Sequence, residues 1–275
     1  MTYNLLAMLT NAQIQTFQEQ GFVLGGRVLT DAQVDVLRSE IQRVMRTPEF
    51  PTESQPVRCI NVSQTQGAPV WQIVNIWQAS EPFALLIRNK SIAADVACLT
   101  RAKELRIWHD QVVYKPKDIG GTASWHQDSP EWGGDRPVLT PPTQISAWVA
   151  LDEVSEENGC LWMVPGSHLW GPANNLIQKI SNHLKLPAEH SGRKLRKAAC
   201  PVPKGYVHFH HGLTWHSSSP NTSGRSRRAI AVHYMPENTR YVADNEHVMK
   251  QFVTVGDGEM MAGSAFPQVY PIHVI

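Results

Sequence analysis

Residues 205–216 read Gly-Tyr-Val-His-Phe-His-His-Gly-Leu-Thr-Trp-His. The segment contains two short β-type runs, Gly205–His210 and Thr214–His216, with a turn at His211-Gly212 between them. Comparable runs, separated by turn residues, occur at Arg106–Lys115, Thr143–Leu151, Gly159–Val164 and Arg227–Met235. Short strands with Gly, Pro, Asn and Asp turns between them indicate an all-β sandwich or barrel.

The first hundred residues have a different texture and predict helices. Thr10-Asn11-Ala12-Gln13 and Thr30-Asp31-Ala32-Gln33 both match the capping box, with Thr at the N-cap and Gln three residues later. The first helix should end near Gly21, where a short strand starts. The second has apolar residues at helical spacing: Val34, Leu37, Ile41 and Val44. A third helix is expected over Pro82–Leu99, and an irregular connection over Thr47–Pro69.

Composition narrows the class of partner. The chain has 275 residues, of which 42% are hydrophobic and 18% charged, and its net charge is +1. This balance favours a soluble domain with a sizeable core and gives no support for binding nucleic acid or an anionic membrane. No secretory signal, membrane span or CxxC pair is visible, so we expect a cytoplasmic protein with a small-molecule substrate. The sequence leaves the oligomeric state open.

A histidine and a carboxylate stand two residues apart in Trp125-His126-Gln127-Asp128. Residues at this spacing on a strand point to the same face. Two histidines and one carboxylate are the ligand set of non-haem Fe(II) oxygenases. The third ligand would come from the histidines of residues 205–216. His208 and His210 share a face and are the rival pair to His216.

Arg227 favours His216, because the next strand returns past this histidine and can place a guanidinium in the same cavity. A buried arginine is costly unless an anion pairs with it. If iron holds a 2-oxo acid by its keto and C1 carboxylate oxygens, the distal carboxylate needs such a partner. Arg225 shares strand parity with Arg227 but lies nearer the turn, whereas Arg228 should face the opposite way.

Several further segments fit one family pattern, in the family's order. They are His126-Gln127-Asp128, Trp148-Val149-Ala150-Leu151-Asp152, Glu157-Asn158-Gly159-Cys160-Leu161, Val164-Pro165-Gly166-Ser167-His168, His211-Gly212 through His216 to Asn221, and Arg227-Arg228-Ala229-Ile230. Across residues 105–235 the chain resembles the phytanoyl-CoA dioxygenase (PhyH) family. Phe17 with Gly21-Phe22 also resembles the family's opening.

The resemblance implies a mostly β fold with supporting helices, a double-stranded β-helix or jelly roll of cupin type. It implies that His126, Asp128 and His216 bind Fe(II) and that Arg227, with Ser218 nearby, holds 2-oxoglutarate. Trp148 and Gln111 match positions that line the co-substrate pocket, and Gln72 or Asn75 is expected to reach it. We expect a single domain over 1–275: a mainly helical support (1–104), a jelly-roll catalytic core (105–240) and a C-terminal extension (241–275).

The implied activity is that of an Fe(II)- and 2-oxoglutarate-dependent dioxygenase, an oxidoreductase. It would use O2 to hydroxylate an unactivated C–H bond of a small-molecule or acyl substrate, releasing succinate and CO2. Related halogenases carry Gly or Ala at the position of Asp128, so the carboxylate favours oxygenation. Desaturation, epoxidation or ring formation in natural-product biosynthesis are alternative outcomes. A non-catalytic metal-binding sensor of cupin type, or a metal-dependent hydrolase or isomerase, are alternative classes.

Loops should set the choice of substrate. Residues 129–140, with Trp132 and Arg136, and residues 174–199 are expected to cover the mouth of the cavity. Other polar residues are expected to have structural roles. His109 and Asp110 are adjacent on a strand and cannot both bind one metal. The acidic run from Asp152 to Glu157 is expected to cap a solvated turn.

Overall fold

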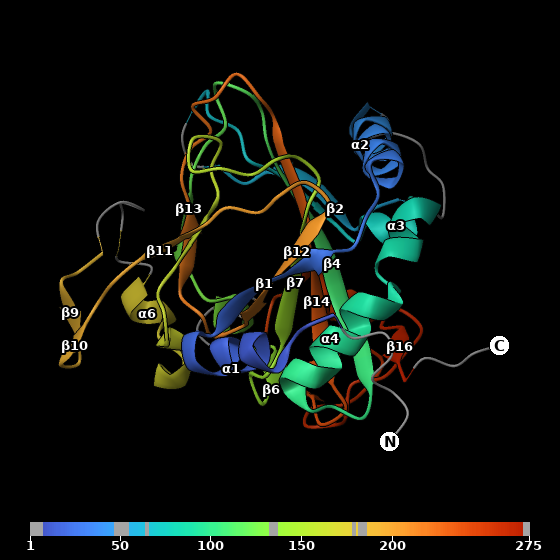
Figure 1. Ribbon diagram of the computed structural model, residues 1–275. Coiled ribbons are helices and arrows are strands. Elements are labelled where there is room, and N and C mark those ends of the chain that lie inside the picture. Colours follow the sequence, from blue (N-terminus) through green and yellow to red (C-terminus); the bar gives the residue numbers. More distant parts are fainter. Residues whose placement is uncertain are drawn as a thin grey trace.

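The computed structural model describes residues 8–46, 55–63, 66–131, 137–177, 180 and 186–271. Two antiparallel sheets face each other (Figure 1). The large sheet has the strand order β1-β12-β7-β14-β4-β3-β2, and β16 also pairs with β4. Its strands are β1 (Phe22–Arg27), β2 (Arg58–Asn61), β3 (Trp71–Val74), β4 (Leu105–Lys115), β7 (Ile145–Ala150), β12 (Tyr206–His211), β14 (Arg227–Pro236) and β16 (Gln268–Tyr270).

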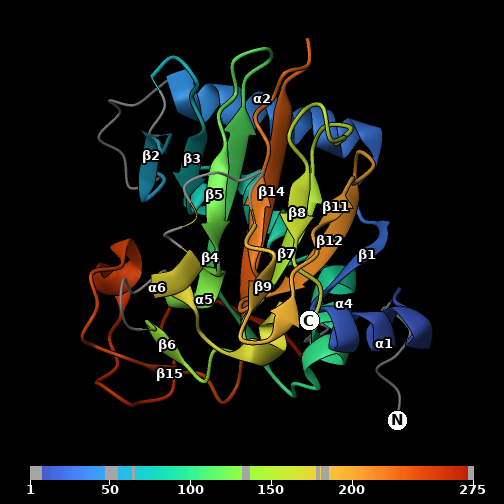
Figure 2. The same cartoon turned by 90° about the vertical axis from the view of Figure 1, so that its left-hand side faces the viewer.

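The small sheet has the order β11-β8-β13-β5 and lies in front of the large sheet in Figure 2. Its strands are β5 (Ala123–His126), β8 (Leu161–Met163), β11 (Ala198–Cys200) and β13 (His216–Ser218). Two ribbons complete the strands: β6 (Leu139–Thr140) with β15 (Arg240–Tyr241), and β9 (Glu189–His190) with β10 (Arg193–Lys194). The predicted mostly β jelly roll with supporting helices is confirmed.

Helices cover the outer face of the large sheet, where α2, α3 and α4 lie to its right in Figure 1. The longer helices are α1 (Asn11–Gln20), α2 (Asp31–Arg46), α3 (Glu81–Leu86) and α4 (Lys90–Thr100). The shorter ones are η1 (Ile76–Gln78), α5 (Asp128–Glu131), η2 (Ser167–Trp170), α6 (Asn174–Ile177) and η3 (Val248–Phe252). Thr10 caps α1 through the predicted capping box, and Gly21 ends the helix in the left-handed conformation, as glycine allows.

The main hydrophobic core lies between these helices and the outer face of the large sheet. The apolar stripe of α2, predicted from its spacing, is buried there. Each such aliphatic side chain contributes about 1.5–3 kcal/mol through its burial. The sheet supplies the alternate residues of its strands, among them Ile73, Val112, Val149, Val207 and Ile230.

The residues between them face the small sheet, because side chains alternate along a strand. Strand register places them in rows, since paired residues of neighbouring antiparallel strands share a face. One row contains Val74, Gln111, Ala231, Trp148 and His208. The next contains His109, His233, Ser146 and His210. Polar and aromatic side chains therefore gather between the two sheets.

Two expectations about the elements are corrected. The helix predicted over Pro82–Leu99 is two helices, because Asn89 starts a new one by accepting from the amides of Ser91 and Ile92. The connection predicted over Thr47–Pro69 contains β2 in its described part, and β3 follows it. The N-terminal part also contributes three strands, β1, β2 and β3, to the large sheet.

Asp152 is also corrected, because it is buried and does not cap a solvated turn. Its Oδ1 lies 2.6 Å from Nη2 of Arg38 in α2, and its Oδ2 lies 2.9 Å from Nε of Arg228 in β14. The carboxylate therefore joins helix α2 to strand β14. Among the described residues, no helix is long and apolar enough to cross a membrane.

Candidate metal centre and co-substrate site

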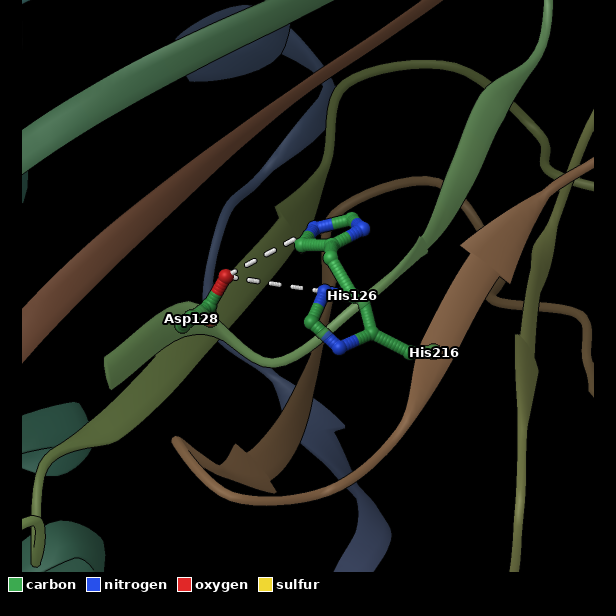
Figure 3. A group of neighbouring side chains, drawn as sticks. All are labelled: His126, Asp128 and His216. Carbon is green, nitrogen blue, oxygen red and sulfur yellow. Dashed lines mark ion pairs between the residues drawn. The ribbon is translucent and has the colours of Figure 1, made fainter. Parts of the chain in front are cut away.

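Three side chains from two parts of the chain meet between the sheets (Figure 3). His126 ends β5, Asp128 begins α5, and His216 begins β13, where it pairs in register with His126. One ligand atom from each residue lies within 4.8 Å of the others. Oδ1 of Asp128 is 3.8 Å from Nε2 of His126 and 3.5 Å from Nε2 of His216. Two imidazole nitrogens and one carboxylate oxygen thus converge.

The backbone fixes which nitrogen of each imidazole is available. Nδ1 of His126 lies 2.7 Å from the carbonyl of Ser124, and Nδ1 of His216 lies 2.9 Å from that of Thr214. A carbonyl only accepts, so both Nδ1 atoms carry a proton, and in the neutral form of each ring Nε2 has the lone pair that can bind a metal. Burial, then the neighbouring His126, lowers the pKa of His216 well below its usual value, which keeps this imidazole neutral. This is the arrangement that metal-ligating histidines adopt.

The second oxygen of Asp128 is held by residues that do not belong to the triad. Ser146 donates to Oδ2 over 2.6 Å, and Nε2 of His210 lies 3.1 Å from the same oxygen. Burial alone would raise the pKa of Asp128, but His216 and His210 together hold it well below its usual value. Oδ1 of the carboxylate is thus aimed at the two Nε2 atoms.

The rival histidine pair does not form a ligand set. His210 contacts Asp128, whereas His208 lies in the row of Trp148 and its ring stacks on Phe22 with centroids 5.8 Å apart. Burial lowers the pKa of His208 to about 3. The structure brings His216, and not His208, to His126 and Asp128.

Arg227 faces inward at the far end of the same space and is 1% exposed. Its guanidinium carbon lies 5.4 Å from the centroid of the Trp148 ring, and its Nη1 donates to the carbonyl of Val113 over 3.3 Å. Its buried Nε has no hydrogen-bond partner within the described part of the chain. Burial lowers the pKa of Arg227 to about 10. Arg225 is exposed and Arg228 binds Asp152, so neither competes for this position.

Lys115 is a buried cation beside Arg227 that the sequence did not single out. Its Nζ donates to Oγ of Ser218 over 2.6 Å and to the carbonyl of Ser219 over 2.5 Å. Burial, then Arg227, lowers the pKa of Lys115 well below its usual value. A Cβ at Gly159 would lie 3.3 Å from its Cδ and 2.5 Å from the carbonyl of Ser219, so a glycine leaves the room that this lysine fills. No stretch of the sequence pointed to this residue, because its pairing with Arg227 depends on the strand register.

Ser218 is set up as a donor by this contact. Its Oγ accepts from Lys115, so its own hydrogen must point elsewhere. The buried Nε–H of Arg227 likewise has no acceptor among the described residues. These buried donors lie close together, and no carboxylate of the described residues makes a hydrogen bond to them. Such an arrangement fits a bound anion better than a closed core.

The remaining predicted residues divide into three groups. Gln111 lies in the same inward row as Trp148, and Gln72 accepts a hydrogen bond from Arg58. Asn75 is engaged elsewhere: it accepts from the amide of Asp110 and donates to the sulfur of Met249. Trp132 and Arg136 lie outside the described residues.

The chemistry of the side chains shows which metal and which co-substrate the site could hold. Two neutral imidazoles and one carboxylate suit a divalent iron with open positions. A buried arginine and a serine hydroxyl on the same inner surface suit the far carboxylate of a dicarboxylic 2-oxo acid. The residues present therefore fit both groups. A jelly roll with these features is that of the Fe(II)- and 2-oxoglutarate-dependent oxygenases.

The comparison with protein families agrees. The family described as "Phytanoyl-CoA dioxygenase (PhyH)" matches residues 17–229, and the chain belongs to this family. It is accordingly an oxidoreductase, a dioxygenase that uses Fe(II), 2-oxoglutarate and O2.

Two curated relatives illustrate the similarity. The peroxisomal phytanoyl-CoA dioxygenase of Bos taurus is 24% identical over 269 residues, which covers 90% of this chain and 76% of the bovine protein. The phytanoyl-CoA dioxygenase domain-containing protein 1 of Danio rerio is 28% identical over 282 residues, covering 86% of this chain and 94% of the fish protein.

Solved structures share the fold. The non-heme alpha ketoglutarate dependent carbocyclase SnoK from nogalamycin biosynthesis superposes with a TM-score of 0.74 at 24% identity, covering 95% of this chain and 96% of SnoK. The epimerase SnoN, solved with Fe3+, alpha ketoglutarate and nogalamycin RO, gives a TM-score of 0.75 at 20% identity, covering 94% and 97%.

Proposed function

We propose that this oxygenase hydroxylates an unactivated C–H bond of a small-molecule substrate. In this proposal Nε2 of His126, Nε2 of His216 and Oδ1 of Asp128 hold Fe(II). Arg227 and the hydroxyl of Ser218 bind the distal carboxylate of 2-oxoglutarate, and Trp148 lies beneath the guanidinium. The single observation that carries the assignment is that the two carboxylate oxygens of Asp128 have different partners. One of its oxygens faces both Nε2 atoms, and Ser146 and His210 occupy the other.

Iron, 2-oxoglutarate and O2 together supply the oxidising power. One oxygen atom enters succinate as 2-oxoglutarate loses CO2, and the other enters the substrate, so that C–H becomes C–OH. The protein's own contribution is positional. Arg227 and Ser218 orient the co-substrate, and the buried walls around them exclude water. The carboxylate at position 128 supports oxygenation over halogenation, because it fills the third protein ligand position.

A metal sensor of the same fold is the weaker alternative. The buried donors at Arg227 and Ser218 would have no role in a protein that only bound a metal. A hydrolase or isomerase would need a general acid or base beside the metal. The carboxyl group that lies there, Asp128, is already engaged by Ser146 and His210.

The first test is spectroscopic and needs no substrate. Anaerobic addition of Fe(II) and 2-oxoglutarate should give a weak visible charge-transfer band. Asp128→Ala should abolish the band, and Arg227→Gln should require far more 2-oxoglutarate to produce it. An enzyme that gave no band, and no succinate with any compound tested, would not be a 2-oxoglutarate oxygenase. Full activity in Asp128→Ala would contradict the ligand assignment.

The reaction outcome is tested with labelled oxygen once a substrate is found. Hydroxylation in 18O2 should place one labelled atom in succinate and one in the product, as mass spectrometry would record. A product that had lost two hydrogens without gaining the label would identify desaturation or ring formation instead.

A further inference from the structure

We propose that Arg58 forms a second anion-binding site in the same cavity, and that the substrate carries a carboxylate or phosphate group which this arginine binds. The inference rests on the proposed function, because it assigns a substrate class to the iron site. The chain's charge and composition do not distinguish an acid from a neutral compound. The placement of Arg58 does.

Strand register puts Arg58 on the inner face of the large sheet. It pairs with Val74 of β3, which pairs with Gln111 of β4. Gln111 in turn belongs to the row that contains Trp148. Residues paired in this way point to one face. Arg58 is therefore on the cavity side of β2, at the edge of the sheet that carries the co-substrate residues.

The guanidinium of Arg58 is partly buried, and no carboxylate among the described residues pairs with it. Its Nη2 donates to Oε1 of Gln72, and its buried Nε has no hydrogen-bond partner in the described ranges. Burial is the cause that lowers the pKa of Arg58, and no described carboxylate opposes it. Other arginines of the chain, such as Arg38 and Arg43, form ion pairs with aspartate or glutamate. An arginine withdrawn from water without an anion fits a ligand carboxylate or phosphate.

A series of imidazole rings begins in the row next to that of Arg58 and Gln111 and reaches the iron ligands. After burial, Arg58 is the next cause that lowers the pKa of His247, to about 3. The His247 ring stacks on His109 with centroids 5.4 Å apart, and His109 lies 4.4 Å from His233. Nδ1 of His233 is 3.8 Å from Oδ2 of Asp128.

This series of rings suits the body of an acidic substrate. The rings are flat and pack against one another, so they suit an apolar or aromatic substrate body. Trp108 adds a further ring beside His247, with centroids 5.3 Å apart. A substrate held by its anionic end at Arg58 would lie along the rings and present a carbon several bonds away to the iron. The attacked carbon is thus remote from the acid group.

The test uses benzoate, benzamide and phenyl phosphate as probes of the anaerobic enzyme saturated with Fe(II) and 2-oxoglutarate. Saturation blocks the Arg227 site, so a change in the visible band reports binding elsewhere in the cavity. Benzoate, phenyl phosphate or both should perturb the band, and benzamide should not. Which of the two anions binds identifies carboxylate or phosphate as the recognised group.

Arg58→Gln should weaken the bound anion about 10- to 100-fold, as expected for lost hydrogen bonds to a charged group. Arg58→Lys should retain part of the affinity. The exposed Arg225→Gln serves as the matched control and should bind as the wild type does. Unchanged anion affinity in Arg58→Gln, no anion binding to the wild type, or equal binding of benzamide would overturn the proposal.

The failure of this inference can be told apart from failure of the proposed function. If the visible band forms but the anions do not bind, only the role of Arg58 is lost. If the band itself never forms, the iron and 2-oxoglutarate assignment is wrong. The band titrated with 2-oxoglutarate in Arg58→Gln also serves as a folding control, because it should match the wild type.

Discussion

The ligand atoms of the triad are aimed by residues that do not themselves belong to it. Backbone carbonyls of Ser124 and Thr214 set the tautomers of the two histidines, and Ser146 and His210 set the rotation of the Asp128 carboxylate. Such supporting contacts usually affect metal affinity nearly as much as the ligands do. Metal affinity should therefore respond to changes behind the triad.

Ser146→Ala removes the donor at 2.6 Å from Oδ2 of Asp128. We expect the affinity for Fe(II) to fall about 10- to 100-fold, because the carboxylate would then be free to rotate. Anaerobic metal titration of the apoprotein measures this directly. Ser217→Ala is the control, since the buried hydroxyl of Ser217 has no hydrogen-bond partner among the described residues. Equal affinities in the two variants would show that Ser146 does not orient Asp128.

Lys115→Met should act on the co-substrate and leave the metal alone. The change keeps the length of the side chain but removes the donor that engages Oγ of Ser218. We expect the Kd of 2-oxoglutarate to rise about 10-fold, the effect of one hydrogen bond worth about 1–1.5 kcal/mol. Lys117→Met alters an exposed lysine two residues away and should change nothing. A 2-oxoglutarate titration of the visible band gives both values, and an unaltered Kd in Lys115→Met would rule out this role.

Strand β14 shows how one element serves two surfaces. Arg227 points into the barrel toward Trp148, and its neighbour Arg228 points outward to Asp152. Asp152 also binds Arg38, so the outward residue fastens β14 to helix α2. Alternation along the strand thus separates co-substrate binding from structural support.

Asp152→Ala should therefore reduce stability more than activity. The change leaves two arginines close together without their anion, and loss of one partner from a buried pair costs about 3–5 kcal/mol. Urea denaturation should show this as a lower free energy of unfolding. Asp35→Ala removes the exposed carboxylate on the other side of Arg38, where the loss should be within about 1 kcal/mol. Losses of equal size would show that Asp152 forms no more than a surface pair.

The elements were predictable where the signal is local. The capping box at Thr10 lies within one helical turn and the apolar stripe of α2 within one helix, and both are observed. Asn89, a residue with high N-cap propensity, stands in the polar run Arg88-Asn89-Lys90-Ser91, and this local signal could have split the third helix. β2 and β3 carry no clear alternation in sequence. The pairing of β2 with β3, and of β3 with β4, defines them as strands.

For the candidate site too, local signals were readable in the sequence and contacts between distant strands were not. The spacing of His126 and Asp128 on the chain pointed to a metal, and family resemblance supplied His216 and Arg227. Lys115, Ser146 and Arg58 were not anticipated, because each depends on which strand lies beside its own. Lys115 is opposite Arg227, and Ser146 is opposite His210 and His233. Register between distant strands is not written in any single stretch of sequence.

At the scale of the whole molecule, several histidines are withdrawn from water as neutral imidazoles. Burial lowers the pKa of His208, His211 and His247 to about 3 in the folded protein, against about 6.5 in an unfolded chain. Below pH 6.5 the unfolded chain takes up protons that the folded protein does not. The stabilising contribution of these groups is complete above pH 6.5 and is lost as the pH falls toward 3.

His208→Phe tests this linkage at a residue outside the triad. For the apoprotein, the free energy of unfolding should fall with decreasing pH less steeply in the variant, by about 1.4 kcal/mol per pH unit between pH 6 and 4. Urea denaturation across this range gives the two slopes. Measurement at pH 8 isolates the effect of packing alone, since no proton uptake differs there. Parallel slopes would mean that His208 is not a buried neutral imidazole.

The position of β5 has a mechanical consequence. It is the outermost strand of the small sheet, pairs with β13 through an irregular register, and carries His126 at its end. A metal ion shared by His126, Asp128 and His216 would act as a reversible cross-link between segments far apart in the chain. It would close a long loop and hold this edge strand against β13. Metal loading should then protect the amides of β5 from hydrogen exchange far more than those of the central strand β14.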